Sequence, residues 1–295
     1  MALLAPRRGA PARAAAVLAG VLLLGACTGG PEPAPAPVKP SASGTAPTTG
    51  GVPSPDAAPD AVTLTSGPVA FEVTVPGPAA EPGADPPVRV EADDDGGTVL
   101  TLRPGAEAAA LVLTTPGTLT ANADGTVTVL DAAGTPVGGL SAPTVVDGGS
   151  GPVDGSPAPR AALAVSGSTT AEVVVVRPDG EASGRGDALA ATSGAYAVTT
   201  ALGTATVRSA VWGDREGGLS LAVDPTAWAR TAGVAGSDVL WTQLVAAEPD
   251  ADAPGMHDQL VCHALGAPDK ATWNLEPWRP DVGLVAVLAA RCNPT

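Results

Sequence analysis

The sequence predicts a mainly β protein, in which an N-terminal antiparallel β module of the sandwich type precedes a small disulfide-closed α+β module. Two observations predict this order. Across residues 62–200, short runs of alternating apolar and polar residues are separated by Asp-Gly pairs, which is typical of antiparallel strands joined by tight turns. Across residues 201–295 the amino-acid composition changes, because all five tryptophans and the last two cysteines of the chain lie there.

The β module is predicted from its alternating runs, which are rich in Val, Thr and Leu and suit a half-buried pleated surface. The runs are residues 69–75, 88–91, 99–102, 126–130 and 172–176, with Asp-Gly turns at 95–96, 124–125, 147–148 and 179–180. Between Phe71 and Tyr196 the module has no aromatic residue on which a sugar ring could stack. We therefore interpret it as a spacer or interaction module.

The Asp-rich turns allow a second interpretation, which is a calcium site at Asp93, Asp94 and Asp95. Calcium loops place oxygen ligands at alternating positions that converge on one point. No loop of that pattern surrounds these residues, and hairpin turns account for the same aspartates. We therefore expect neither a metal nor a cofactor.

Two strands and two helical segments are expected in the C-terminal module. Residues 207–212 and 219–223 alternate as strands would, on either side of a Gly-rich turn. Pro225 is suited to open a helical turn. Residues 238–247 place apolar side chains at helical spacing, with Ser237 as the N-cap. Because each tryptophan buries a large apolar area, their concentration indicates a core separate from that of the β module.

Net charge excludes one class of partner. The chain carries a formal charge of −15, and it becomes more acidic if the Arg-containing N-terminal segment is removed. Nucleic-acid binding requires clustered Lys and Arg, so no nucleic-acid partner is expected. Electrostatic adhesion to anionic lipid is disfavoured for the same reason.

Residues 1–26 have the layout of an export signal, with a positive n-region, an apolar h-region at 14–24 and small residues before Cys27. The apolar run is far shorter than the ~20 residues of a membrane-spanning helix. The stretch Leu24-Gly25-Ala26-Cys27 resembles the lipobox of bacterial lipoproteins. That resemblance implies cleavage before Cys27 and acylation of this cysteine, for instance with palmitate. An ordinary secreted protein with a chance cysteine is the alternative.

Residues 27–61 are rich in Pro and Ala and have almost no large apolar side chain, so we expect an unfolded tether. At ~3.1 Å per residue, an extended tether would reach up to ~100 Å. Two acyl chains on Cys27 would anchor the protein stably. The expected location is therefore the outer face of the cell membrane, with the folded part extending into the cell wall.

Cys262 and Cys292 are most simply a disulfide, because disulfides persist in exported proteins. Closing a loop of about 30 residues would stabilise the fold by roughly 3–4 kcal/mol on the chain-entropy estimate. A zinc site that adds His257 and His263 has suitable atoms but lacks the paired spacing of zinc modules. A nucleophilic pair of Cys262 and His263 is weaker, because sequence neighbours point in different directions.

Residues 273–280 carry the candidate binding residues of the chain. Two prolines favour extended backbone for the residues before them. In an extended strand, Trp273 and Leu275 would share one side, and Asn274 and Glu276 the other. The alternative is that the tryptophans are core and Glu276 pairs with Arg279 at the surface. The binding candidates are Trp273, Asn274, Glu276, Trp278 and Arg279.

Glu276, together with His257 or His263, is also the acid/base candidate of a small extracellular hydrolase. Such an enzyme requires these groups to converge in one open cleft, whereas a structural module would keep them apart or buried with partners. The favoured interpretation is a non-catalytic binding or structural module that contacts a wall polymer or another exported protein. A toxin-like tip on a stalk is a third hypothesis, which rests on domain order alone.

Three motifs carry a family resemblance: Met-His-Asp-Gln-Leu-Val-Cys-His at 256–263, the Trp-Asn-Leu-Glu-Pro-Trp-Arg-Pro end of 270–280, and Arg-Cys-Asn-Pro at 291–294. Together they resemble the terminal module of a family of exported actinobacterial proteins classed as a domain of unknown function. The resemblance covers roughly the last 85 residues. It implies export, an envelope setting and a disulfide, and it brings no known activity.

Overall fold

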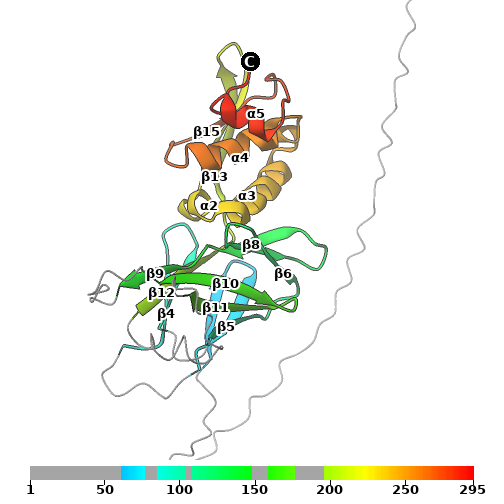
Figure 1. Cartoon of the computed structure of the whole chain (residues 1–295). Helices are drawn as coiled ribbons and strands as arrows, with labels where there is room; N and C mark the ends of the chain where they lie inside the picture. The colour runs from blue at the N-terminus through cyan, green and yellow to red at the C-terminus, as the bar shows by residue number, and fades with distance from the viewer. Residues whose placement is uncertain (1–60, 77–84, 104–107, 148–158, 177–195) are drawn as a thin grey trace, which may run out of the picture. The chain divides into compact units, whose positions relative to one another are not determined.

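A computed structural model describes residues 61–76, 85–103, 108–147, 159–176 and 196–295 (Figure 1). Cys27, the export signal and nearly all of the tether lie outside the described residues, as does the Asp-Gly pair at 179–180. The described chain is mainly β, with antiparallel sheets and a small C-terminal α+β region, so the predicted fold class is confirmed. None of its helices has the length and apolar character needed to cross a membrane.

Two antiparallel sheets form the β module. One has five strands, in the order β1 (Val62–Ser66), β2 (Val69–Thr74), β5 (Ala109–Leu113), β11 (Thr170–Val176) and β10 (Arg160–Ser166). The other follows the order β3 (Val88–Ala92), β4 (Thr98–Leu102), β12 (Tyr196–Gly203), β8 (Pro136–Leu140), β7 (Val127–Leu130) and β6 (Thr118–Ala121), and β9 (Thr144–Asp147) also pairs with β12. Strand β12 ends at Gly203, so this sheet extends beyond residue 200.

The two sheets share one apolar core, as the alternation in the sequence predicts. Phe71 and Leu111 of the five-stranded sheet lie in the same buried cluster as Leu100 and Leu140 of the other sheet. The turns between strands also follow the prediction. In the turn after β3, Oδ1 of Asp93 accepts hydrogen bonds from backbone N–H groups within the turn, at 2.9 and 2.7 Å. This aspartate therefore serves the hairpin, as the turn interpretation expected.

The C-terminal region builds a three-stranded sheet covered by helices. Its strands lie in the order β13 (Val207–Arg215), β14 (Gly218–Pro225) and β15 (Trp273–Leu275). The helices are α2 (Ala227–Thr231), α3 (Gly233–Ala247), η1 (Pro249–Ala251), α4 (Met256–Gly266) and α5 (Leu284–Ala289). A second core joins Leu221 of β14 to Leu240 of α3, Leu260 of α4 and Trp273 of β15. Pro55–Thr295, which contains both cores, is one compact unit.

Three local predictions for this region need correction. Helix α3 begins at Gly233, five residues earlier than expected, and Ser237 lies inside it, where its hydroxyl donates to the Gly233 carbonyl at 3.0 Å. Thr226 caps α2, and Pro225 ends the preceding strand. Trp228 does not join the C-terminal core, because its indole N–H donates to the carbonyl of Ala201 on the sandwich.

Candidate functional site

The predicted strap at 273–280 begins as a short edge strand. Residues 273–275 form β15, in which Trp273 pairs with Val223 and Leu275 with Leu221. Trp273 and Leu275 are fully buried and Asn274 is half-buried. The expected alternation is therefore confirmed for these three residues. It fails at Glu276, which is only 3% exposed.

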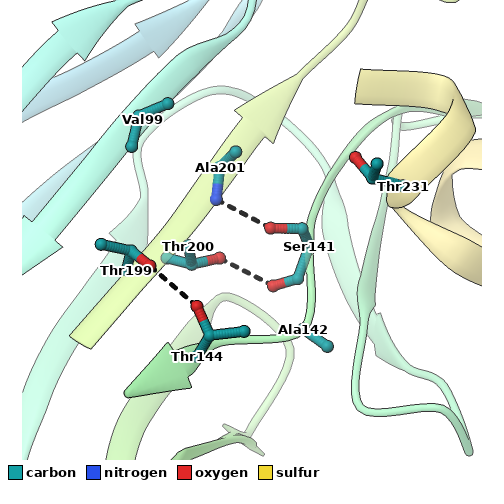
Figure 2. Close-up of a pocket in the computed structure, with 8 residues that line it drawn as sticks. All are labelled: Val99, Ser141, Ala142, Thr144, Thr199, Thr200, Ala201 and Thr231. Carbon is teal, nitrogen blue, oxygen red and sulfur yellow. Dashed lines mark hydrogen bonds between the residues drawn. The ribbon is translucent and has the colours of Figure 1, made fainter. Parts of the chain in front are cut away.

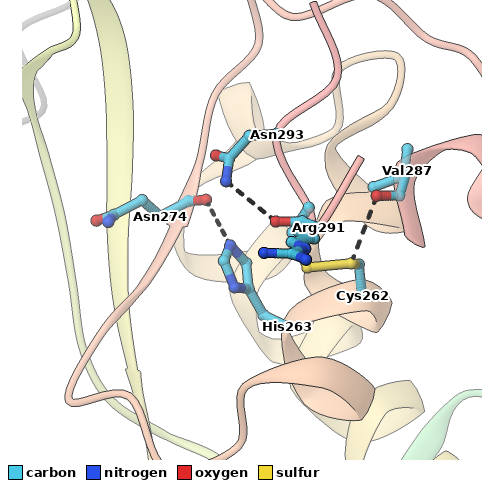
Figure 3. Close-up of a disulfide and its surroundings, with 7 residues drawn as sticks. Cys262, His263, Asn274, Val287, Arg291 and Asn293 are labelled. Carbon is cyan, nitrogen blue, oxygen red and sulfur yellow. Dashed lines mark hydrogen bonds between the residues drawn. A yellow bond between two sulfur atoms is a disulfide. The ribbon is translucent and has the colours of Figure 1, made fainter. Parts of the chain in front are cut away.

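Helix α4 covers the free edge of β15 with two side chains. The amide group of Gln259 accepts from the backbone N–H of Glu276 at 2.9 Å and donates to the Glu276 carbonyl at 3.0 Å. One turn further along α4, Nε2 of His263 lies 3.1 Å from the backbone carbonyl of Asn274 (Figure 3). Because residues four apart share one face of a helix, these side chains occupy the place of a further strand. They satisfy backbone groups that burial would otherwise leave unpaired.

These contacts define the chemical state of His263. Its Nε2 donates to a carbonyl, so the neutral ring leaves a lone pair on Nδ1, which has no hydrogen-bond partner within the described chain. Burial lowers the pKa of His263 from its ordinary value of 6.5, and this outweighs the opposing effect of the Asn274 carbonyl. The ring also stacks on Trp273, with 6.4 Å between centroids. His263 is thus a buried, neutral, hydrogen-bonded residue of the core.

Glu276 and Arg279 form a buried ion pair, with both side chains 3% exposed. The guanidinium of Arg279 also donates to the carboxylate of Glu216 at 2.8 Å and to the Pro294 carbonyl at 3.2 Å. Its Cζ atom lies 4.5 Å from the ring centroid of Trp278. The sequence-based alternative that Glu276 pairs with Arg279 is therefore confirmed for the two partners. It is wrong about their location, because the pair is buried and not at the surface. Trp278 is 45% exposed and not a core residue.

Glu216 reaches Arg279 from the turn between β13 and β14. Glu216 and Gly217 both have positive φ, 53° and 86°, as a two-residue type I′ hairpin turn requires. A non-glycine residue at such a φ is uncommon. Nothing in the sequence singled out Glu216, because its contact with Arg279 joins residues 63 positions apart.

His257 lies apart from the other two acid/base candidates. It is exposed in the first turn of α4 and meets Trp241 of α3 edge-on, with 4.9 Å between ring centroids. Six residues along a helix correspond to about 1.7 turns, which leaves the two side chains about 120° apart, so His257 and His263 face different neighbours. Among the described residues, the three groups therefore do not converge on one open cleft.

The disulfide joins α4 to the segment after α5, as predicted (Figure 3). Cys262 and Cys292 have Cα atoms 5.5 Å apart, and both are buried with Val287 of α5. Because their sulfurs are bonded to each other, they offer neither zinc ligands nor a nucleophilic thiol. The described part of the chain holds no cluster of three or more His, Cys, Asp or Glu side chains suited to a metal ion.

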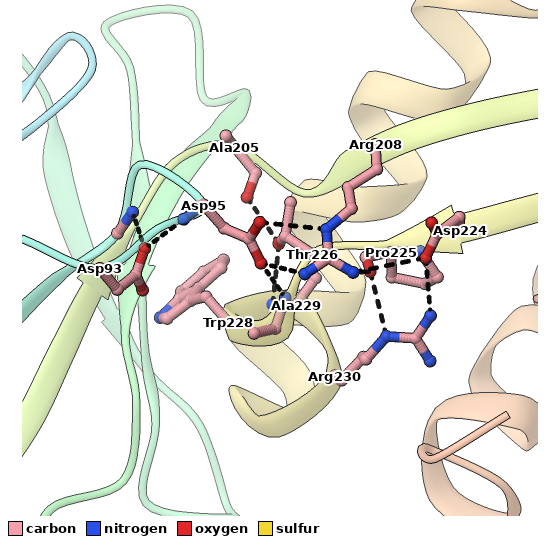
Figure 4. A network of polar contacts seen from close by, with 12 residues as sticks. Asp93, Asp95, Ala205, Arg208, Asp224, Pro225, Thr226, Trp228, Ala229 and Arg230 are labelled. Carbon is pink, nitrogen blue, oxygen red and sulfur yellow. Dashed lines mark hydrogen bonds and ion pairs between the residues drawn. The ribbon is translucent and has the colours of Figure 1, made fainter. Parts of the chain in front are cut away.

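Polar contacts that no sequence pattern predicted join the sandwich to the C-terminal region, and we call them the polar junction (Figure 4). The carboxylate of Asp95 accepts from the guanidinium of Arg208 and, at 2.8 Å, from the N–H of Ala227 at the start of α2. The hydrogen bond from Arg208 is the main reason that the pKa of Asp95 is lowered. Asp124 likewise accepts from the N–H of Val234 at 2.7 Å, at the start of α3. Two hairpin aspartates thus hold two helix N-termini, where negative charge is favourable.

A pocket of about 230 Å³ lies beside this junction, between the seven-stranded sheet and α2 (Figure 2). Hydroxyl groups dominate its lining, but most are engaged within the protein. Thr144 and Thr199 bond each other at 2.9 Å, and the hydroxyl of Thr200 donates to the Ser141 carbonyl at 2.7 Å. The lining has no charged side chain, and none of the predicted site residues lies there.

Comparison with known proteins bears on the region that contains the ion pair and the disulfide. Residues 207–295 match the family described as "Protein of unknown function (DUF2599)". We call residues 207–295 the DUF2599 domain after this match. The chain is similar to uncharacterized proteins of Mycobacterium tuberculosis (Rv0477) and Mycobacterium bovis (Mb0487), each 43% identical over 83 residues, which is 25% of this chain and 56% of the relative.

A third relative of the DUF2599 domain is the uncharacterized protein ML2452 of Mycobacterium leprae, 42% identical over 65 residues, which is 21% of this chain and 53% of the relative. The chain therefore spans about half the length of the curated relatives it matches. No solved structure matches the chain. These findings support an actinobacterial domain of unknown function.

Proposed function

We propose that this chain is a lipid-anchored cell-envelope protein whose DUF2599 domain is a non-catalytic binding or structural module displayed in the cell wall. One observation carries the non-catalytic part. The carboxylate of Glu276, the acid/base candidate of the strap, is buried against the guanidinium of Arg279. A buried carboxylate that is neutralised in this way positions backbone and does not meet substrate.

The histidines support the same proposal. A general acid or base must come within hydrogen-bond reach of the proton it transfers. His263 is buried and uses its Nε2 on the Asn274 carbonyl. His257 is exposed and packs edge-on against the ring of Trp241, whereas Glu276 is buried, with its carboxylate on Arg279 and its backbone on Gln259. Each group thus has a structural role of its own.

Anchoring is supported by the sequence. The lipobox resemblance at residues 24–27 supplies an acylated cysteine, and the Pro- and Ala-rich segment that follows supplies a tether. The proposed partners are the membrane, through the lipid on Cys27, and a wall polymer or another exported protein, through the folded part. The acidic charge of −15 argues against nucleic acid.

Acylation is tested by producing the chain with and without Cys27→Ala in an actinobacterial host fed a palmitate analogue that can be detected after electrophoresis. We expect label on the wild-type protein and none on the variant. An unlabelled wild-type chain in a host that labels its other lipoproteins would overturn the lipid anchor. A matched Cys262→Ala variant should keep the label, because it leaves the lipobox intact.

Catalysis is tested on the purified oxidised protein with a panel of wall fragments, glycans and exported peptides. A bound ligand raises the thermal midpoint by mass action, so a binding module should show a midpoint shift without product. Product that accumulates with wild type and disappears with Glu276→Gln, at an unchanged midpoint, would establish the hydrolase instead.

A further inference from the structure

The end of the DUF2599 domain around α5 presents an apolar surface to solvent. Its large side chains are well exposed, and we call this group the apolar tip: Leu265 (65% exposed), Val282 (45%), Val285 (83%) and Leu288 (38%). All six residues of α5 are apolar, yet only Val287 is fully buried. A group of exposed apolar side chains on one short helix and its neighbours is a candidate interaction site.

The tip is held in place by the disulfide. Val287, Cys262 and Cys292 form a small core of their own beneath α5. Leu265 lies three residues after Cys262 on α4, and residues three apart share a helix face, so it stands next to α5. The Pro294 carbonyl, beyond the disulfide, accepts from Arg279 at 3.2 Å. The exposed side chains therefore stand on a support that the disulfide fixes. Figure 1 shows α5, the helix that carries Val285 and Leu288, near the C-terminus of the chain.

We propose that the apolar tip binds the surface of a lipid bilayer and so forms a second membrane contact beside the lipid on Cys27. This inference rests on the proposed lipid anchor. The Pro- and Ala-rich tether expected from Cys27 to residue 61 would have a root-mean-square length of about 30 Å as a flexible coil and a reach of ~100 Å if extended. The bilayer is thus the apolar surface that the folded part meets at the highest effective concentration.

The shape of the tip fits this occupant. The tip residues lie on α5, just before it and on α4, and their side chains are 38–83% exposed. A membrane surface takes up exposed side chains of this kind without a groove, which a bound peptide helix would need. An exposed apolar helix can sink shallowly into the interface between headgroups and acyl chains.

The charges near the tip predict which lipid it prefers. Asp281 and Arg291 flank α5 with opposite charges, and no cluster of Lys or Arg surrounds it. Because the whole chain is acidic, anionic headgroups should repel it. The tip is therefore expected to bind zwitterionic bilayers more tightly than anionic ones.

The test is flotation of purified, oxidised residues 55–295 with vesicles. This segment is one compact unit with its own cores and lacks the export signal and Cys27, so its binding reports on the tip and not on acylation. Phosphatidylcholine vesicles should carry it upward, and adding phosphatidylglycerol at low salt should weaken binding. Val285→Glu should weaken binding about tenfold or more, because it places a charge in the inserted face.

Val211→Glu is the matched control, because Val211 is 62% exposed on β13, outside the tip. It should bind vesicles as wild type does. Equal binding of wild type and Val285→Glu, or no flotation of wild type with phosphatidylcholine, would overturn the proposal. So would a dimer in sedimentation that Val285→Glu dissolves without any vesicle binding, since the tip would then join two copies. The palmitate-analogue labelling of Cys27 tests the lipid anchor in a separate experiment, so failure of the anchor and failure of the tip can be told apart.

Discussion

The side-chain amide of Gln259 pairs with both backbone polar groups of Glu276, at 2.9 and 3.0 Å. Strand β15 is the edge of its sheet, and an uncovered edge exposes a row of unpaired donors and acceptors. Gln259 and His263 of α4 close that edge. The residue that the sequence suggested as catalytic is thereby fixed by its main chain as well as by its ion pair.

Replacing Gln259 with Met should destabilise the domain, because the thioether fills the space but leaves a buried N–H and a buried C=O unpaired. We expect a loss of about 2–4 kcal/mol in the free energy of unfolding, measured by denaturant titration. Gln259→Glu keeps an acceptor for the Glu276 N–H but buries a carboxylate against the Glu276 carbonyl, so it should destabilise the domain as well. If the Met variant were as stable as wild type, the edge closure would not contribute to stability.

The ion pair between Glu276 and Arg279 predicts strong coupling. Arg279→Met leaves the Glu276 carboxylate buried without its cation, which should cost about 3–5 kcal/mol. Glu276→Gln should cost less, because Arg279 still has Glu216 as a partner. The double variant should lose clearly less stability than the two single losses together.

A double-mutant cycle by chemical unfolding measures this coupling. Arg291→Met is the control, because Arg291 is exposed and the change should alter stability by no more than about 0.5 kcal/mol. Additive losses in the cycle would mean that the two residues stabilise the domain independently.

Sequence patterns correctly predicted the structural elements that depend on residues close together in the sequence. Alternation and Asp-Gly turns predicted the sandwich, and the expectation of export made Cys262 and Cys292 the disulfide that the structure contains. Only the first part of the predicted strap is extended, because residues 273–275 form β15 whereas residues 277–279 form a turn in which the Arg279 N–H donates to the Glu276 carbonyl. The pairing of Glu276 with Arg279, three residues away, was predicted correctly. Each of these depends on residues close in sequence or on residue types with few alternatives.

Contacts between residues far apart in the sequence could not be predicted from local sequence patterns. Glu216 and Gln259 look like ordinary surface residues in the sequence, and only the fold brings them to the strap. Asp95 looked like one of several turn aspartates, and its contact with Arg208 spans 113 positions. The burial of Glu276 was missed for the same reason, because the C-terminal tail that covers Arg279 returns from beyond the disulfide.

Asp124 should anchor α3 to the sandwich. Burial acts to raise its pKa, but the hydrogen bonds from Val234 and Thr126 outweigh this and the pKa is lowered. Asp124→Ala removes the acceptor of the Val234 N–H at the helix start, where such a loss costs about 0.5–2 kcal/mol. Hydrogen exchange at the first amides of α3 should accelerate.

Asp131→Ala is the control for this prediction, because Asp131 accepts N–H groups only within its own turn between β7 and β8. Its loss should leave exchange in α3 unchanged. A second route to the same contact is Gly233→Ala. A Cβ there would lie 2.1 Å from the Asp124 carboxylate, and φ is +54°, so this variant should loosen the start of α3 as well. Unchanged exchange in both variants would contradict the anchoring role.

His263 should make the stability of the domain depend on pH below neutrality. Burial disfavours the imidazolium, so the folded pKa lies below the unfolded value of 6.5. Between these two pKa values the unfolded chain binds more protons than the folded chain. The contribution of His263 to the free energy of unfolding is therefore fully present above pH 6.5, and it is lost as the pH falls toward the folded pKa. A single group contributes at most about 1.4 kcal/mol per pH unit. In His263→Gln, whose amide can still donate to Asn274, this slope between pH 7 and 5 should largely disappear. His257→Gln should keep the wild-type slope, because His257 is exposed, and a slope that survives in His263→Gln would assign the dependence to another group.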